Sequence, residues 1–252
     1  MRTIAVAGGK GGSGKTSVAV HLAVGLARRR KRVLLVDLDP TRHASTWLLG
    51  PLSEAKGIAD VLLEERVRPE HRHHVEDGLE VLPATRALQS LDLKLANEPG
   101  GQFILRRALE DLENIDFTLL DCPPALGYFT TAAVFAADAI LAPLACSPLC
   151  LAGLELLEEH VSLMSRRAKS APLRVDLVLF AADSREALTA ETRALLESKA
   201  GKRLMRSEIR VSTAGKMLPT RRKTAWDGGD PRGAEDYAAL LAEVLGRWNA
   251  SK

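Results

Sequence analysis

Residues 9–16 read GKGGSGKT and satisfy the phosphate-loop pattern Gly-x4-Gly-Lys-Thr. Residues 3–7, just before them, form a short and mostly apolar run suited to a buried strand. After the loop, Val18, Leu22 and Leu26 recur at helical spacing. A strand, a glycine-rich turn and a helix therefore follow one another in the order that an anion site at a helix N-terminus requires.

The loop predicts a site for a nucleoside triphosphate, held by inward-pointing backbone N–H groups. We expect Lys15 to reach the β- and γ-phosphates and the Thr16 hydroxyl to ligate Mg²⁺. A glycine-rich turn without a ligand is the alternative, but it does not explain why strand, loop, lysine, threonine and helix occur in order. The predicted nucleotide-binding residues are Gly9, Lys10, Gly11, Gly12, Ser13, Gly14, Lys15, Thr16 and Ser17.

Length and composition limit the class of protein. The chain has 252 residues and 46% hydrophobic residues, and no linker rich in Pro, Gly or Ser divides it, so we expect residues 1–252 to form a single domain. No apolar stretch approaches the roughly 18–20 residues needed to cross a bilayer. The apolar run at the N-terminus ends in glycines, unlike a secretory signal. Three cysteines, an odd number, argue for a reducing cytoplasm.

Strand-like and helix-like segments alternate along the chain. The expected strands are residues 3–7, 32–36, 79–82, 117–120, 139–144 and 175–180. The expected helices are residues 15–30, 101–113, 127–137, 151–168, 187–199 and 233–247. This alternation predicts an α/β fold with a mainly parallel central sheet and helices on both faces. Residues 40–78 and 212–232 are the least regular, and we expect loops or short helices there.

Three aspartates lie at the ends of predicted strands. Ligands of parallel sheets bind beyond the carboxyl ends of the strands, so these side chains are expected to meet the phosphate loop. Asp121 follows an apolar strand, as a Walker B element requires, and we assign it to the magnesium site with Asp37 helping to hold the metal's water shell. Asp39 is placed to position or polarise the attacking water. The alternative for each is an aspartate that caps a turn.

Basic residues crowd one segment near the end of the chain. Residues 199–223 contain nine Lys and Arg side chains and a single acid, Glu208. This imbalance is typical of a surface that binds a polyanion, with an ordinary solvated surface as the alternative. The basic residues are Lys199, Lys202, Arg203, Arg206, Arg210, Lys216, Arg221, Arg222 and Lys223.

Two small clusters contain side chains that can bind metals. Cys146 and Cys150 lie close in sequence, but no set of Cys and His partners accompanies them. His71, His73 and His74 form the second cluster, and a solvated loop face is the expected structure because no further ligand is evident.

Taken together, these residues resemble the ParA/MinD group of deviant Walker-A ATPases, and within it the ParA-type partition ATPases. The first matching stretch, residues 10–16 (KGGSGKT), is highly specific. The resemblance extends over nearly the whole chain. The further matching stretches are residues 36–40 (VDLDP), 121–127 (DCPPALG) and 151–154 (LAGL) and, more weakly, 209–212 (IRVS) and 232–237 (RGAEDY).

The resemblance implies a homodimer with ATP and Mg²⁺ between the subunits, in which Lys10 of each subunit reaches the phosphates of the other. Lys10, Lys15 and Asp39 then form the catalytic set. It also implies non-specific DNA binding by the ATP-bound dimer, with Arg185 and Arg210 at the family's basic positions. A ParB-like partner stimulates the slow hydrolysis. Such a protein acts in chromosome or plasmid partitioning, in the cytoplasm and on the nucleoid.

The chain departs from the family pattern at two places. Thr41 follows Pro40 where the family usually has glutamine, so the contacts of that glutamine are not transferred. Residues 206–208 (RSE) stand where Pro-Arg-Asn is usual, so adenine contacts are not transferred either. The chain begins almost at the first strand, without a helix-turn-helix extension, and we do not expect operator binding.

Three other functions of the family stay open at this point. A MinD-like ATPase needs a basic amphipathic helix at its end, whereas residues 237–248 carry few positive charges, so we expect that helix to dock on the core without stable membrane association. A ParA-like ATPase for another cargo is compatible with the same residues. An ATPase of the nitrogenase iron-protein type needs paired cysteines, and Cys122 lacks that pattern.

Overall fold

Eight strands form one sheet in the order β3-β4-β2-β5-β1-β6-β7-β8. The computed structural model describes residues 1–51, 56–147, 150–168, 173–183 and 186–249, so the predicted contact Arg185 lies outside the described residues. All neighbouring strands are parallel except β3 and β4, which confirms the predicted α/β fold with a mainly parallel sheet. The strands are β1 (Arg2–Val6), β2 (Val33–Asp37), β3 (His73–Glu76), β4 (Leu79–Leu82), β5 (Phe117–Asp121), β6 (Ala139–Ala145), β7 (Arg174–Ala182) and β8 (Leu204–Arg210).

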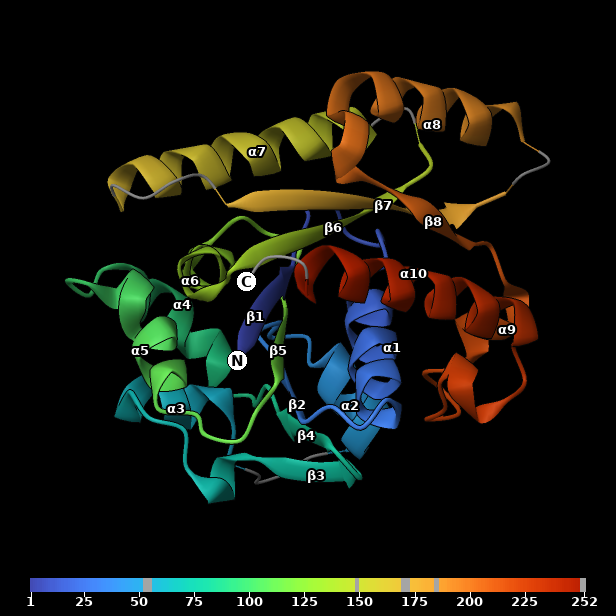
Figure 1. Cartoon of the computed structure of the whole chain (residues 1–252). Coiled ribbons are helices and arrows are strands. Elements are labelled where there is room, and N and C mark those ends of the chain that lie inside the picture. Colours follow the sequence, from blue (N-terminus) through green and yellow to red (C-terminus); the bar gives the residue numbers. More distant parts are fainter. Residues whose placement is uncertain (52–55, 148–149, 169–172, 184–185, 250–252) are drawn as a thin grey trace.

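Helices cover both faces of this sheet, as predicted (Figure 1). α1, α2 and α10 pack on one face, and α3 to α8 pack on the other. The helices are α1 (Lys15–Arg28), α2 (His43–Leu49), α3 (Ile58–Glu64), α4 (Leu88–Ala96), α5 (Ile104–Glu110), α6 (Tyr128–Ala136), α7 (Cys150–Arg167), α8 (Ala187–Ala200), α9 (Thr213–Met217) and α10 (Pro231–Asn249).

Two hydrophobic cores arise from the alternation of side chains along the strands. In β1, Ile4 and Val6 face the core that contains α1 and α10, whereas Ala5 faces the core that contains α3 to α8. Both faces of the central strands are therefore buried. This explains why their sequences read as continuous apolar runs, as is usual for parallel sheets covered on both sides.

The register of the central strands brings the predicted site residues to one edge of the sheet. Val6 at the end of β1 lies opposite Asp121 at the end of β5. Asp121 in turn lies opposite Asp37 at the end of β2. The phosphate loop leaves β1 at this level, so the loop and both aspartates share the carboxyl edge, as predicted.

The structure adds two edge strands that the sequence patterns did not predict. β3 contains His73 and His74, and His71 just before it is fully buried, so the expectation of a solvated loop was wrong. His71 lies in a 3₁₀ turn that packs against α3, and its Nδ1 accepts a hydrogen bond from the Arg68 N–H at 3.1 Å. β8 runs through the basic segment. The remaining irregular regions form loops and short helices, as expected.

Helix α10 docks on the core, as predicted. Its apolar side chains pack against α1 and the sheet, and those that are buried are Tyr237, Leu240, Leu241, Val244 and Trp248. Its last turn is tied to β7 through the buried Asp176, which accepts hydrogen bonds from Arg247 Nη1 at 2.9 Å and Trp248 Nε1 at 3.1 Å. Within the described ranges, no helix combines the length and apolar character needed to span a bilayer.

His21 connects α1 to α10. Its ring stacks on Tyr237 of α10, with 3.8 Å between ring centroids. The Ala225 N–H donates to His21 Nε2 at 3.0 Å, so Nδ1 carries the ring proton and donates to the Ser17 carbonyl at 2.7 Å. Burial lowers the pKa of His21 to about 4. The ring is therefore neutral at physiological pH.

We predict that acid removes stability through His21. An unfolded chain protonates this residue near pH 6.5 and the folded chain only near pH 4, so the contribution is complete above pH 6.5 and is lost as the pH falls towards 4, by up to roughly 3 kcal/mol. His21→Gln removes this titration. The difference in unfolding free energy between wild type and variant should shrink from pH 7.5 to pH 4.5 in urea titrations.

His74→Gln, at an exposed position of β3, is the control and should leave the pH dependence unchanged. A gap between wild type and His21→Gln that stays constant over this range would contradict a neutral, buried imidazole.

Candidate active site

The glycine-rich loop is shaped to receive an anion. Gly12 and Gly14 have φ of 76° and 91°, in the left-handed region that favours glycine. α1 begins at Lys15, and no side chain caps its N-terminus. Ser13 Oγ is buried and has no hydrogen-bond partner among the described residues. These free donors and the helix dipole together favour a negatively charged ligand at this point.

Lys15 lies inside the loop that it was predicted to serve. Its side chain is almost fully buried, and Nζ donates a hydrogen bond to the Lys10 carbonyl at 2.9 Å. Burial lowers the pKa of Lys15, and the nearby Asp121, Cys122 and Asp39 counteract that effect. The ammonium group is thus held between the loop and the carboxylates.

Asp121 and Asp37 are both buried, but they differ in their hydrogen bonds. Neither carboxylate oxygen of Asp121 makes a hydrogen bond of good geometry to another described residue, although the Thr16 hydroxyl is close enough to lower the pKa of this carboxyl. Asp37 Oδ2 accepts from the Ser45 N–H at 2.8 Å and the Ser45 hydroxyl at 2.6 Å, and Asp37 Oδ1 accepts from the Asp39 N–H at 3.1 Å. Asp37 therefore also anchors the start of α2.

The electrostatics of this pair suit a cation. Burial raises the pKa of Asp121 well above its usual range, and the neighbouring Asp37 raises it further. Burial likewise raises the pKa of Asp37, to about 6. Buried carboxylates of this kind are normally paired with a positive charge. The residues present therefore fit a Mg²⁺ ion, which the oxygens of Thr16 and Asp121 would hold, with Asp37 close by in register.

Lys10 lies on the surface of its own subunit in this structure. Its Nζ donates to the Ser147 hydroxyl at 3.4 Å, at the end of β6. Its predicted reach to the phosphates of a second subunit stays a prediction.

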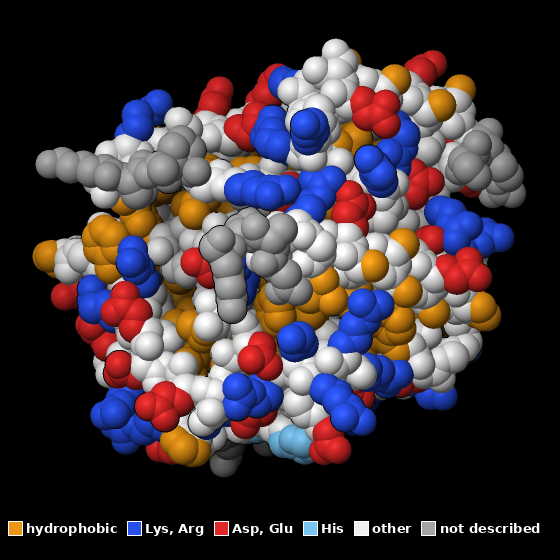
Figure 2. Space-filling model, viewed as in Figure 1, with side chains coloured by type: hydrophobic (Ala, Val, Ile, Leu, Met, Phe, Trp, Pro, Cys, Tyr) orange, Lys and Arg blue, Asp and Glu red, His pale blue; other side chains and the backbone are white. Residues whose placement is uncertain are grey.

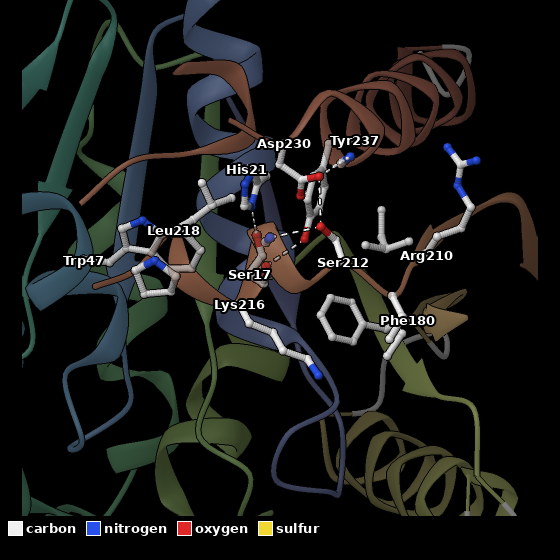
Figure 3. A pocket seen from close by; sticks show the side chains of 16 residues that line it. Ser17, His21, Trp47, Phe180, Arg210, Ser212, Lys216, Leu218, Asp230 and Tyr237 are labelled. Atoms are coloured by element: carbon white, nitrogen blue, oxygen red, sulfur yellow. Dashed lines mark hydrogen bonds between the residues drawn. The ribbon is translucent and has the colours of Figure 1, made fainter. Parts of the chain in front are cut away.

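A pocket of about 220 Å³ opens beside the first turn of α1 (Figure 3). The Ser17 hydroxyl faces into this region and shares a 2.7 Å hydrogen bond with Tyr237 Oη. Apolar side chains form most of the wall, including Phe180, Ile209 and Leu218. A mostly apolar pocket with a few polar groups is the usual form of a small-molecule site.

The ends of β7 and β8 shape this pocket. Ala181 has φ of 55°, a conformation that costs free energy for a residue with a side chain, and it coincides with an irregular register between the two strands. Arg210 lines the pocket, but its guanidinium points away from it (Figure 3). That group pairs with Asp236 of α10, with Nε to Oδ1 at 2.8 Å, and with Glu235 at 3.4 Å.

The predicted DNA-contacting residues fall into two groups rather than one surface. β8 runs parallel to β7, so Lys202 and Arg203 lie at its amino end, whereas Lys216 of α9 follows its carboxyl end. The seven residues of β8 span roughly 20 Å, so Lys202 and Lys216 lie beyond opposite ends of this strand. Figure 2 shows Lys and Arg side chains gathered around the amino ends of β7 and β8, beneath α7 and α8.

The two groups also differ in how their charge is used. At the amino end, Arg203 pairs with Glu158 and Lys199 with Glu155, while Arg206 is exposed on β8. A second group follows β8 at its carboxyl end, and its members are exposed and form no ion pair with another described residue. These residues are Lys216, Arg221, Arg222 and Lys223. We call them the carboxyl-edge cations.

Several residues of the site were not predicted from the sequence. Ser45 holds Asp37, and Tyr237 holds Ser17, but both depend on tertiary packing. Phe180 lies at the end of a predicted strand, and that position could have indicated it because ligands bind there in parallel sheets. Cys146 and Cys150 remain free thiols, and no group of three metal-binding side chains occurs in the part of the chain that the structure describes.

Known proteins resemble this chain over its whole length. The family model AAA_31, an AAA domain, matches residues 1–174. The chromosome-partitioning ATPase Soj of Thermus thermophilus is 35% identical over 252 residues, which cover 98% of this chain and 96% of that protein. The chromosome partitioning protein ParA of Myxococcus xanthus is 39% identical over 168 residues, 66% of this chain and 59% of that protein, so this match spans less than two thirds of the relative.

A solved structure extends this likeness to the fold. Cobyrinic acid a,c-diamide synthase from Mycobacterium smegmatis, with bound ADP and magnesium, superposes with a TM-score of 0.85. The match covers 100% of this chain and 97% of that one at 24% identity, which shows the shared fold alone.

We predict that Gly14→Ala disrupts the loop, because a Cβ there would lie 2.4 Å from the Phe180 ring and φ is 91°. The unfolding free energy should fall by roughly 1–3 kcal/mol in urea titrations, and nucleotide binding should weaken. Gly11→Ala is the matched control, because a Cβ at that position meets nothing within 4 Å. Equal losses in the two variants would show that loop flexibility, and not the Phe180 contact, sets the requirement for glycine.

Proposed function

Because the chain belongs to the ParA/Soj family of partition ATPases, we propose that it hydrolyses ATP with Mg²⁺ and uses the ATP-bound state to bind and partition DNA. The proposal takes residues 1–252 as one ATPase domain. The observation that carries it is the set of buried polar atoms without partners at the carboxyl edge, Ser13 Oγ and both carboxylate oxygens of Asp121. A magnesium triphosphate supplies an acceptor for the first and a cation for the second.

The nucleotide is proposed to lie along the loop with its base in the 220 Å³ pocket. Ser17 belongs both to the first turn of α1 and to the pocket wall, so phosphates on the loop would leave the sugar and base beside Phe180. The predominantly apolar wall suits a planar base. This placement supplies the base contacts that the family pattern could not transfer.

The catalytic groups follow from the same arrangement. Lys15 would neutralise charge on the β- and γ-phosphates, which is the main task in phosphoryl transfer. Bound Mg²⁺, held by Thr16 and Asp121 with Asp37 fixing its water shell, would draw charge from the same oxygens. Asp39, with 7% of its surface exposed, is the acid proposed to orient the attacking water.

We propose that the active site is completed by a second copy of the chain. The ammonium group of Lys10 is exposed, and among the described residues its hydrogen-bond partner is the Ser147 hydroxyl at 3.4 Å, so little holds this side chain to its own subunit. A cation that crosses to the partner's phosphates would tie hydrolysis to dimerisation, as an arginine finger does.

DNA is proposed to contact the carboxyl-edge cations. Lys216 lines the proposed nucleotide pocket, and the Lys223 carbonyl accepts a hydrogen bond from Trp47, which also lines it, so nucleotide binding can affect their position. Exposed cations without carboxylate partners are free to pair with phosphates. The amino-end group is a weaker candidate because Lys199 and Arg203 already pair with glutamates of α7. Arg210 would have to leave Asp236 before contacting DNA.

A ParB-like activator and a place on the nucleoid in the cytoplasm complete the proposal. A MinD-like membrane function has less support, because the apolar side chains of α10 that would insert into a bilayer are buried against α1. A ParA-like function for another cargo uses the same chemistry and stays open.

We predict that Lys15→Ala binds ATP more weakly than the wild type, because the variant lacks the cation inside the phosphate loop. The dissociation constant for a fluorescent ATP analogue should rise about tenfold to a hundredfold. Lys31→Ala, beyond the end of α1, should bind as the wild type does. Unchanged affinity in the Lys15 variant would refute the phosphate-loop assignment.

We predict that DNA binding requires ATP and the carboxyl-edge cations. Electrophoretic shifts with ATP, ADP or no nucleotide should show retention with ATP only. Arg221→Glu combined with Lys223→Glu should weaken DNA binding in the presence of ATP. The slope of the logarithm of DNA affinity against the logarithm of salt concentration should fall by about 0.9 for each lost phosphate contact. Lys202→Glu combined with Arg206→Glu is the control at the other edge. A stronger effect in the control would move the DNA surface to the amino ends of β7 and β8.

A further inference from the structure

The side chain of Asp39 is held by the residue at which the chain departs from the family pattern. Asp39 Oδ1 accepts two hydrogen bonds from Thr41, one from the backbone N–H at 2.8 Å and one from the hydroxyl at 2.7 Å. The backbone of Asp39 is fixed as well, because its N–H donates to Asp37 Oδ1 at 3.1 Å. Asp39 is thus anchored at both ends.

A third side chain supports Thr41. Its hydroxyl oxygen lies 3.2 Å from His43 Nδ1. The single hydroxyl proton of Thr41 is already donated to the carboxylate, which only accepts when ionised. We assign the other proton of this contact to His43 Nδ1, which then donates to the Thr41 hydroxyl. In this assignment the hydrogen bonds run from His43 to Thr41 and from Thr41 to Asp39.

This series of hydrogen bonds uses one carboxylate oxygen of Asp39 and leaves the other oxygen for another role. With Oδ1 occupied twice, Oδ2 has no hydrogen bond to any other residue in the described ranges. Without Thr41, the carboxylate could turn about its Cβ–Cγ bond and present either oxygen, because that torsion is broad. Two hydrogen bonds to one oxygen remove this freedom, and they set which oxygen meets a water molecule.

We propose that Thr41 and His43 are positioning residues for the hydrolytic reaction. Thr41 fixes the orientation of Asp39, and His43 fixes the hydroxyl of Thr41. This inference rests on the proposed ATPase function, and it assigns to Thr41 a role at the position where other members of the family usually have glutamine. Neither residue lines the proposed nucleotide pocket, so we expect their effect on the rate of hydrolysis and not on binding.

A purely structural role is the competing explanation, since the same hydrogen bonds also shape the turn before α2. The two explanations differ in what they predict for Thr41→Val: a structural role would weaken ATP binding and lower the unfolding free energy together with kcat, whereas a positioning role lowers kcat alone. Serine at position 41 and asparagine at position 43 keep a hydrogen-bonding group at the same place, so they test whether that group and not the remaining side chain is required.

The test compares Thr41→Val with Thr41→Ser in steady-state ATPase assays with DNA present. In Thr41→Val, kcat should fall about tenfold, the effect of losing one hydrogen bond to a charged group, while the dissociation constant for ATP changes less than about twofold. Thr41→Ser should recover most of the rate. Thr46→Val, an exposed threonine of α2, is the control and should behave as the wild type.

His43→Leu and His43→Asn give an independent pair. His43→Leu should lower kcat about threefold, as expected when a hydrogen bond to a neutral group is lost, and His43→Asn should restore it. Circular dichroism of every variant checks that the fold is retained.

A wild-type rate in Thr41→Val, or an equal loss in Thr41→Ser, would overturn the positioning role while leaving the ATPase function intact. A wild-type protein that neither binds nor hydrolyses ATP would overturn both.

Discussion

Asp121 ends the central strand β5 with two carboxylate oxygens that are buried and have no hydrogen-bond partner in the described part of the chain. Asp37 lies beside it in register, and the Lys15 ammonium interacts with it electrostatically. Burying carboxylates costs free energy that the surrounding protein does not recover by itself. The strands β1, β2 and β5 must keep their register for this edge to exist, and the edge in turn needs a positive ligand. This arrangement supports the proposed site for Mg²⁺ and a phosphate group.

Much of this edge could be predicted from the sequence, because its signals are local. The phosphate loop is one continuous pattern, and β1, β2 and β5 are buried on both faces, so each reads as an apolar run that ends where a ligand binds. Edge strands carry a different pattern. β8 is an edge strand with a neighbouring strand on one side only, and it mixes Arg206, Glu208 and Arg210 with apolar residues. These charged residues masked the apolar pattern of a strand, so the sequence predicted a basic surface there.

Side-chain partners were harder to predict, because they depend on residues far apart in the chain. Tyr237 meets Ser17 across 220 positions, and no spacing rule connects them. Thr41, by contrast, lies two residues from Asp39, and the sequence did single it out as unusual. Its role required the orientation of a hydroxyl group, which a sequence does not contain. The division of the basic segment into two groups was also hard to predict, because it depends on the direction of β8 in the sheet. That direction determines which basic residues lie at the same edge.

Helix α10 brings the two halves of the proposed function together. Tyr237 meets the first turn of α1, while Asp236, the preceding residue, pairs with Arg210 at the end of β8. A shift of α10 along α1 would alter both contacts at once. The proposed nucleotide pocket and the surface around Arg210 thus depend on the position of one helix.

Gly14 and Phe180 place a limit on motion at the site. The loop and the ring are so close that no methyl group fits between them. The phosphate loop therefore cannot move towards β7 unless the Phe180 ring changes its position. The ring likewise cannot move towards the loop unless the loop is displaced. Because the loop and the ring are in contact, a displacement of one would displace the other directly, without a hinge between them. A ligand bound at the loop and a ligand bound in the pocket would therefore influence each other through the contact between Gly14 and Phe180.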